Sequence, residues 1–283
     1  MSSSTHSNSD CASPSSPRAL IAIILAAGKG TRMQSDLPKV MHPVAGRPMV
    51  RWVVDAAREI GCTRIVLVVG YGAELIEAEF AGDRDVEFAL QAEQLGTGHA
   101  VSMSKALLES VAMGTDFFVL CGDGPLIRSA TLEALLTAHR SATASATLAT
   151  SVIDEPTGYG RIVRNSTGAF ERIVEHKDAS EIERAIGEIN PSYYCVRGEE
   201  LFTTLAQIGN SNRSGEYYFT DLFGILASAG HTVYAVDAVP AEDVLSINDP
   251  TQLATVDAIL RARPVSRTAN TSQRPHPTMG VSQ

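Results

Sequence analysis

Short apolar runs alternate along the chain with segments whose apolar positions recur every three or four residues. The runs predict buried strands, and the recurring pattern predicts helices that pack on one face. The predicted strands span residues 19–26, 64–69, 86–90, 117–120 and 143–152. The predicted helices span residues 48–60, 73–80, 98–108, 129–140, 220–229 and 250–261. This order predicts an α/β fold, a Rossmann-like and mostly parallel sheet with helices on both faces.

The alternation changes after about residue 156, where short strands and turns follow one another. We interpret residues 156–220 as a small inserted β-rich lobe within one domain of residues 19–263. Residues 1–18 and 264–283 are rich in Ser, Thr, Pro and Asn, a composition typical of disordered tails. Ligands of parallel sheets bind beyond the carboxyl ends of the strands. Residues that directly follow a predicted strand are therefore the first candidates for a site.

The segment after the first predicted strand has the clearest chemistry. Residues 25–32 read Leu-Ala-Ala-Gly-Lys-Gly-Thr-Arg, and a lysine, Lys39, follows shortly. Gly28 and Gly30 let the backbone turn tightly and bring N–H groups close to a ligand. Arg32 and Lys39 add positive charge beside this loop, so the segment suits a triphosphate.

Other glycine-rich motifs fit this segment less well. A P-loop requires Ser or Thr after Gly-Lys, and here Gly30 follows Lys29. A dinucleotide-binding fingerprint requires a third glycine, and that position is Met33, which counts against a dehydrogenase. An ordinary glycine-rich turn remains open from the glycines alone, and the cations favour the phosphate interpretation.

Composition narrows the function classes further. The chain has 283 residues, 44% of them hydrophobic, and a formal net charge of -9, which argues against a nucleic-acid or membrane-surface binder. The four cysteines form no CxxC pair, so we expect reduced thiols and no zinc site. No apolar run reaches transmembrane length, and the N-terminus lacks the pattern of a signal peptide. We therefore expect a cytoplasmic protein.

The glycine loop and several later segments, in this order and spacing, resemble the sugar-1-phosphate nucleotidylyltransferases. The resemblance is to the uridylyltransferase domain of the bacterial bifunctional N-acetylglucosamine-1-phosphate uridylyltransferase/glucosamine-1-phosphate acetyltransferases, and it runs from about Leu20 to Arg263. The segments that carry it are residues 25–33, 37–39, 91–99, 122–123, 156–162, 173–178, 188–190 and 215–221.

The resemblance implies in-line attack of a sugar 1-phosphate on the α-phosphorus of UTP, with Mg²⁺ as cofactor. It implies Asp123 and Asn248 as metal ligands. A turn-forming Asp beside Gly is the alternative for Asp123. For Asn248 the alternative is a helix cap before Pro250, although Asp249 also fits the cap.

The resemblance also assigns the other site residues. It implies Arg32, Lys39 and Asp123 as catalytic residues. It implies nucleotide binding by Leu25, Ala26, Ala27, Gly28, Gly30, Thr31, Gln91, Gln94, Gly96 and Thr97. It implies sugar binding in the lobe and near it by Gly122, Gly160, Glu175, Lys177, Asn190, Tyr218 and Thr220. Surface solvation is the alternative for the charged residues, and a helix cap for Thr97.

The chain departs from the family pattern at Cys121, at Gly124 and at Pro191. These departures leave open the identity of the sugar: N-acetylglucosamine 1-phosphate is our first expectation, and glucose or N-acetylgalactosamine 1-phosphate are alternatives. A catalytically silent nucleotide-sugar-binding protein is a further alternative. We find no hexapeptide repeats after Arg261, so we expect no acetyl transfer. We expect a monomer or weak homo-oligomer.

Overall fold

The computed structural model describes residues 18–263, so both predicted tails except Arg18 lie outside the described residues. The main strands are β1 (Ala19–Leu25), β4 (Arg64–Val69), β5 (Val86–Leu90), β6 (Thr115–Cys121), β7 (Ala146–Val152), β8 (Gly160–Arg164), β9 (Phe170–Val174), β10 (Glu188–Asn190), β11 (Tyr193–Arg197) and β12 (Val233–Asp237). A separate hairpin contains β2 (Pro43–Val44) and β3 (Arg47–Pro48).

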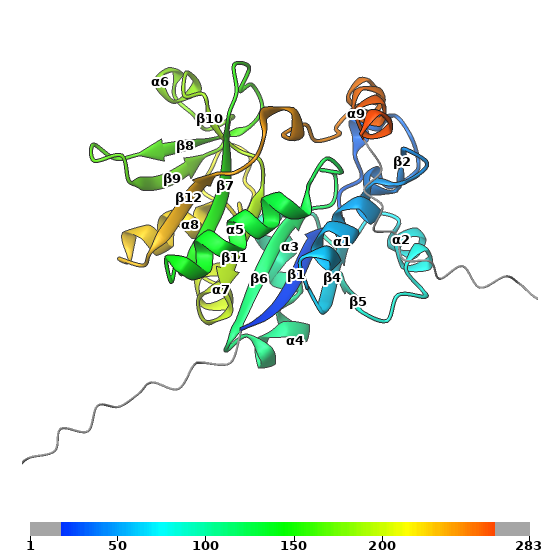
Figure 1. Cartoon of the computed structure of the whole chain (residues 1–283), viewed down its shortest axis with the longest axis horizontal. Coiled ribbons are helices and arrows are strands. Elements are labelled where there is room, and N and C mark those ends of the chain that lie inside the picture. Colours follow the sequence, from blue (N-terminus) through cyan, green and yellow to red (C-terminus); the bar gives the residue numbers. More distant parts are fainter. Residues whose placement is uncertain (1–17, 264–283) are drawn as a thin grey trace, which may run out of the picture.

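The helices connect these strands (Figure 1). They are α1 (Met49–Glu59), α2 (Ala73–Glu79), α3 (Thr97–Met103), α4 (Lys105–Leu108), α5 (Ser129–Ser141), α6 (Glu181–Arg184), α7 (Gly198–Leu205), α8 (Asp221–Ser228) and α9 (Pro250–Ala262). Four short 3-10 turns are η1 (Thr31–Met33), η2 (Lys39–Met41), η3 (Glu109–Val111) and η4 (Ala241–Asp243). Within residues 18–263, no helix is long and apolar enough to cross a membrane.

The ten main strands form one sheet in the order β5-β4-β1-β6-β11-β7-β10-β8-β9, with β12 beside β7. The pairs from β5 to β6 are parallel, as is β7 with β12. The pairs from β6 through β11, β7, β10, β8 and β9 are antiparallel. The α/β fold class predicted from the sequence is confirmed, and its parallel part is the half that carries the glycine loop.

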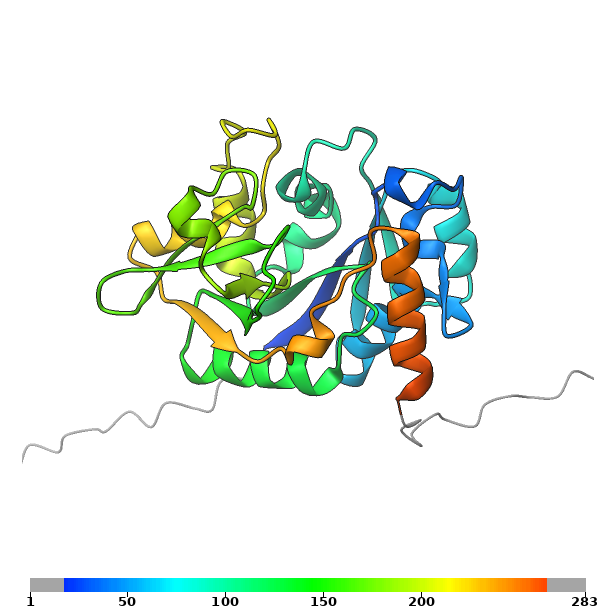
Figure 2. The ribbon, with the colours of Figure 1, turned by 90° about the horizontal axis from the view of Figure 1, so that it is seen from above.

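Helices cover the parallel half on both faces. Leu20, Ala22 and Ile24 of β1 pack into a core with α1 and α5, whereas Ile21 and Ile23 pack on the opposite face with α3 and α7. In Figure 2, α5 (green) lies along one face of the sheet. Because both faces are buried, the strand reads as a continuous apolar run. The carboxyl ends of β4, β1 and β6 lie at one edge, since Leu25 pairs with both Val68 and Cys121.

Two predicted elements differ in their bounds for local reasons. The predicted helix 98–108 is divided at Ser104, whose hydroxyl donates to the carbonyl of Val101 at 2.7 Å, a bond that competes with helical pairing. The predicted strand 143–152 begins only at Ala146, because Thr143 has a left-handed φ of 49°. The predicted strands 64–69 and 86–90 have the same bounds in the structure.

The predicted lobe of residues 156–220 is built on the same sheet. Strands β8, β9 and β10 extend it beyond β7, with α6 beside them (Figure 1). Within the same range, β11 pairs with β6 and β7, so this strand belongs to the body of the sheet. Arg18, which the sequence places in the N-terminal tail, donates to Asp116 and Glu199 and marks the start of the fold.

Gly198, the first residue of α7, is expected to tolerate no side chain. A Cβ there would lie 2.0 Å from the carbonyl oxygen of Ala112. We expect Gly198→Ala to lower the free energy of unfolding by about 1–3 kcal/mol in urea titrations, because the backbones must separate. Gly224→Ala in α8 is the control: its Cβ would meet Arg172 Cβ at an ordinary 3.5 Å, so it should stabilise by about 0.5–1 kcal/mol. Equal unfolding midpoints would contradict this prediction.

Candidate active site

The glycine loop leaves β1 at Leu25 and closes on Lys39. The N–H of Ala26 donates to Val68 O at 2.8 Å, and Ala27 O accepts from the N–H of Tyr71 at 3.2 Å, so the loop is fixed to the end of β4. Gly30 has a φ of 67°, and a Cβ on it would lie 2.6 Å from Lys39 Cβ. Only glycine permits this approach. Beyond these anchored residues, Gly28 and Thr31 are exposed and free to face a ligand.

Four residues that are distant in sequence converge beside this loop. Lys39 Nζ donates to Asp123 Oδ2 at 2.5 Å and to Asn248 Oδ1 at 2.7 Å. Arg32 Nη2 donates to the same Asn248 oxygen at 3.0 Å. The Lys39 and Asp123 side chains are 14% and 23% exposed, so the ion pair is partly shielded from water yet open to a ligand. The structure thus brings together all four residues predicted to act on phosphate and metal.

Local hydrogen bonds orient Asn248 toward this cluster. Asp249 caps α9 by accepting from the N–H of Gln252 at 2.8 Å, and Pro250 follows as the first helical residue. The side chain of Gln252 in turn accepts from the N–H of Asn248 at 2.7 Å. Of the two residues that fit a cap from the sequence, Asp249 is the cap and Asn248 is not. The Asn248 side chain is therefore directed to Lys39 and Arg32. The N–H of Ile247 also donates to the carbonyl of Asp123 at 3.0 Å.

The donor set fits a hard divalent cation. Asp123 Oδ2 and Asn248 Oδ1 are a carboxylate and an amide oxygen, and both already face one positive charge, the Lys39 ammonium. Across residues 18–263, no group of three or more His, Cys, Asp or Glu side chains forms a larger metal site. Two protein oxygens are the pattern expected where substrate phosphates and water complete the coordination shell.

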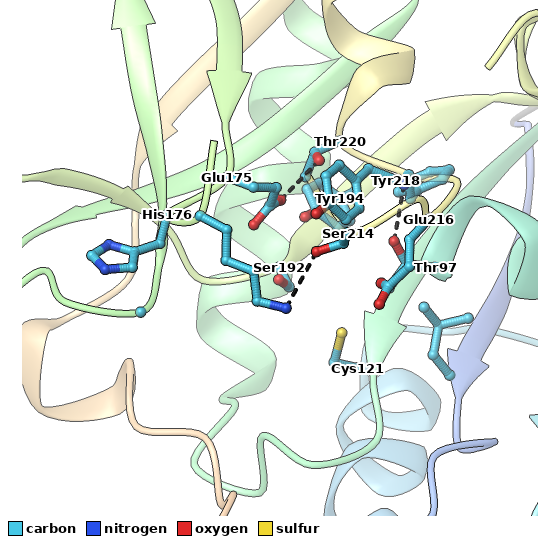
Figure 3. A pocket seen from close by; sticks show the side chains of 14 residues that line it. Thr97, Cys121, Glu175, His176, Ser192, Tyr194, Ser214, Glu216, Tyr218 and Thr220 are labelled. Carbon is cyan, nitrogen blue, oxygen red and sulfur yellow. Dashed lines mark hydrogen bonds between the residues drawn. The ribbon is translucent and has the colours of Figure 1, made fainter. Parts of the chain in front are cut away.

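A pocket with a volume of about 280 Å³ opens next to this cluster, between the end of β6 and the lobe (Figure 3). Its lining residues are Leu25, Thr97, Cys121, Gly158, Glu175, His176, Lys177, Ser192, Tyr194, Ser214, Glu216, Tyr218, Phe219 and Thr220. Six of these are predicted site residues. Low-polarity surroundings and the charge of Asp123 raise the pKa of Cys121 to about 12, so its thiol is neutral near pH 7.

Glu175 and Thr220 line one wall of the pocket, and Gly160 is buried beside Glu175 without lining the pocket. The Thr220 hydroxyl donates to Glu175 Oε1 at 2.9 Å. A Cβ on Gly160 would lie 3.5 Å from the same oxygen. Burial raises the pKa of Glu175, and the nearby carboxylates of Asp221 and Asp178 raise it further. The wall can therefore offer acceptors and, when Glu175 is protonated, a donor to hydroxyl groups.

The opposite rim of the pocket is formed by a segment before α8. Lys177 Nζ donates to Ser214 Oγ at 3.2 Å, and Tyr218 lies beside them. Burial raises the pKa of the Tyr218 hydroxyl. Sequence reasoning assigned Lys177 and Tyr218 to this site and did not find Ser214.

Asn190 takes a different position from the one predicted. It is 5% exposed and is not among the lining residues. Its amide nitrogen donates to the Tyr194 hydroxyl at 2.6 Å, and its oxygen accepts from the N–H of Ser192 at 3.0 Å. In this structure Asn190 supports the lining from behind, while Tyr194 and Ser192 reach the pocket. Tyr194 was missed because the apolar run around it reads as core.

The residues predicted to recognise the nucleotide base lie in one loop, which is held together by its own hydrogen bonds. Gln91 is 3% exposed, and its amide nitrogen lies 3.1 Å from both Gly96 O and His99 Nδ1. Gln94 Nε2 donates to the carbonyl of Gln91 at 3.1 Å. The side-chain nitrogens of Gln91 and Gln94 thus both donate within the loop, and these hydrogen bonds fix the shape of the loop.

Gly96 and Thr97 connect this loop to the rim of the pocket. Gly96 has a φ of 115°, and a Cβ there would lie 2.5 Å from Tyr217 O. Thr97 Oγ1 accepts from the N–H of Phe219 at 2.9 Å and makes no capping bond to its own helix. At the base of the site, the N–H of Gly122 donates to Leu25 O at 2.9 Å and joins the two strand ends.

The chain has curated relatives of high sequence identity. Over 242 residues, 86% of this chain, it is 50% identical to the bifunctional protein GlmU of Brevibacillus brevis and 49% identical to that of Bacillus cereus. The chain spans about half the length of these relatives, 52% in each case.

Solved structures show the same fold at low sequence identity. A UDP-glucose pyrophosphorylase bound to UDP-glucose aligns with a TM-score of 0.69 and 17% identity, over 87% of this chain and 100% of the other. A putative glucose-1-phosphate thymidylyltransferase from Bacillus anthracis aligns with a TM-score of 0.71 and 17% identity, over 87% of this chain and 97% of the other.

A model of the MobA-like NTP transferase domain matches residues 22–190, which include the glycine loop, Asp123 and the lobe strands up to β10. The match covers more than half of the chain. The protein belongs to the MobA-like NTP transferase domain family.

Proposed function

We propose that this chain transfers the uridylyl group of UTP to N-acetylglucosamine 1-phosphate and releases pyrophosphate. An oxygen of the sugar phosphate attacks the α-phosphorus of UTP, and the bond from that phosphorus to the pyrophosphate oxygen breaks on the opposite side. The observation that carries the proposal is the convergence of Arg32, Lys39, Asp123 and Asn248 beside a pocket. The sequence identity to the GlmU relatives supports the choice of substrates.

The main task of such a site is to hold two polyanions together. The N–H groups of the exposed part of the glycine loop would donate to the triphosphate oxygens, and Arg32 and Lys39 would compensate the triphosphate charge. Asp123 and Asn248 would hold Mg²⁺, which would supply charge stabilisation at the phosphate oxygens. Lys39 already reaches both oxygens, so a small movement of its flexible side chain brings the ammonium to a phosphate group.

No side chain is needed as a general base. The phosphate nucleophile is ionised near pH 7 and has no proton to lose. His99 is hydrogen-bonded to Gln91 in the loop of residues 91–99, a contact that fits a role in fixing the shape of that loop. We therefore assign the rate enhancement to alignment and charge compensation.

The pocket would receive the sugar. Glu175 and Thr220 would bind hydroxyl groups, and Lys177 would face the phosphate end. Pro191 removes a backbone donor, and the following Ser192 has a left-handed φ of 68° and lines the pocket. The turn at these residues is therefore where we expect the choice between sugars to be made.

Pyrophosphate release tests the proposal directly. The purified protein is incubated with Mg²⁺, UTP and one of N-acetylglucosamine, glucose or N-acetylgalactosamine 1-phosphate, and kcat/KM is compared. We expect N-acetylglucosamine 1-phosphate to give the highest value, and UTP to be preferred over dTTP, CTP and ATP. Release with none of the sugars would contradict transfer and favour a silent binding protein. A preference for another sugar would contradict the proposed substrate but would leave the proposed uridylyl transfer in place.

A further inference from the structure

Arg161, the second residue of β8, is a buried cation without a counter-charge. It is 1% exposed and is among the largest fully buried side chains of residues 18–263. In this part of the chain no carboxylate lies within ion-pair distance of it, and its Nε has no hydrogen-bond partner. Burial and the charge of Arg184 lower the pKa of Arg161. A buried charge of this kind costs several kcal/mol of stability, so a specific role is required to explain it.

The guanidinium connects three separate segments. Its Nη1 donates to the carbonyl of Tyr159, in the turn directly before β8. Its Nη2 lies 3.3 Å from Nδ1 of His176, in the turn after β9, and 3.5 Å from the carbonyl of Arg184, at the end of α6. The His176 contact requires an unprotonated Nδ1, and burial together with the charge of Arg161 lowers the pKa of His176 accordingly. A planar fork of several donors makes such a three-way connection, and a single ammonium does not.

Two of the three connected segments line the pocket, the turn before β8 through Gly158 and the turn after β9 through Glu175, His176 and Lys177. Gly160 directly precedes Arg161, and Glu175 and Lys177 flank His176 in sequence. Figure 3 shows the His176 ring at the edge of the pocket, directed away from Glu175, Thr220 and the other labelled side chains, and its Nδ1 meets the guanidinium there. Arg161 itself does not line the pocket.

We propose that Arg161 is a positioning residue for the sugar phosphate, which holds the Gly160 and Glu175–Lys177 segments at the spacing that the substrate needs. This inference rests on the proposed function. An apolar side chain would pack between the segments at lower cost but would leave their carbonyls unpaired and their spacing undefined. The buried charge of Arg161 thus lowers stability, but its hydrogen bonds fix the geometry of the pocket wall.

Kinetics of Arg161→Lys and Arg161→Met test the proposal. We expect KM for the sugar 1-phosphate to rise about tenfold in both variants, the equivalent of one charge-assisted hydrogen bond, with KM for UTP unchanged. Arg164→Met is the matched control on the same strand, because Arg164 lies outside the pocket and pairs with Glu188 at 2.6 Å. A general loss of stability would reduce the active fraction and leave both KM values unchanged. An unchanged sugar KM in the Arg161 variants, or an equal rise in Arg164→Met, would overturn the proposal.

A second pair of variants keeps the test decisive if the Arg161 variants fail to fold. His176 is only half-buried, so its replacement leaves the fold intact. His176→Asn keeps an acceptor near the position of Nδ1 and should retain the sugar KM, whereas His176→Leu should raise it. Equal sugar KM values for the two would count against the proposal.

Hydrogen exchange separates this inference from the proposed function. Arg161→Lys should speed exchange in peptides that cover residues 156–160 and 175–184, with peptides over residues 91–99 unchanged. If the wild-type protein releases no pyrophosphate, the proposed function fails, while this measurement still shows whether Arg161 fixes the wall. Unchanged exchange in both segments would refute the positioning role itself.

Discussion

Asp123→Asn is expected to lower kcat for pyrophosphate release by at least about a thousandfold. The carboxylate follows β6, and its Oδ2 and Asn248 Oδ1 are the two oxygens that accept from Lys39 Nζ beside the glycine loop, where we propose that the cation binds. An asparagine is nearly the same size but removes the negative charge, so a divalent cation loses most of its attraction to the site. Several kcal/mol of charge stabilisation at the phosphates are then lost.

Magnesium titrations give this prediction a specific signature. Half-saturation of activity by Mg²⁺ should move to a higher concentration in Asp123→Asn, because Asn248, the other proposed ligand, is neutral. Asp237→Asn is a matched control, since Asp237 is an exposed carboxylate at the end of β12. A variant Asp123→Asn with normal kcat at the wild-type Mg²⁺ requirement would show that the cation binds elsewhere.

The sequence predicted the part of the fold that local patterns determine. Strands buried on both faces read as apolar runs, so the bounds of β4 were predicted as they stand. The bounds of β5, the partly buried strand at the edge of the sheet, were also predicted. The antiparallel place of β11 between β6 and β7 depends on pairing with strands far along the chain. The pattern of apolar residues along the chain does not show which strands pair. The predicted lobe of residues 156–220 therefore included β11, although this strand lies in the body of the sheet.

The site shows the same limit at the level of side chains. The family motifs selected Arg32, Lys39, Asp123 and Asn248, and the strand ends bring them together. Motifs do not tell which way a side chain turns. Asn190 turns behind the lining because the Tyr194 hydroxyl competes for its amide, a contact that exists only after β11 has folded into the sheet. The contacts of Arg161 with His176 and Arg184 likewise form only in the folded protein, so the sequence did not predict them.

Lys39→Met is expected to reduce kcat about a hundredfold, comparable to the loss of one group that stabilises developing negative charge. The lysine stem runs along Gly30, where a Cβ would lie 2.6 Å from Lys39 Cβ, so the loop fixes the ammonium next to the triphosphate position. Methionine keeps much of that apolar stem and removes only the charge. Lys105→Met is the control, because Lys105 is 47% exposed and pairs with Glu109 away from the site.

The magnesium requirement distinguishes Lys39→Met from Asp123→Asn. Removal of the ammonium frees Asp123 Oδ2 and leaves Asn248 Oδ1 with Arg32 as its one remaining cation partner. A divalent cation no longer competes with Lys39 for them, so half-saturation should occur at the wild-type Mg²⁺ concentration or below it, although kcat is low. A higher Mg²⁺ requirement would mean that Lys39 supports the cation site. A normal kcat would mean that the ammonium takes no part in stabilising the departing pyrophosphate.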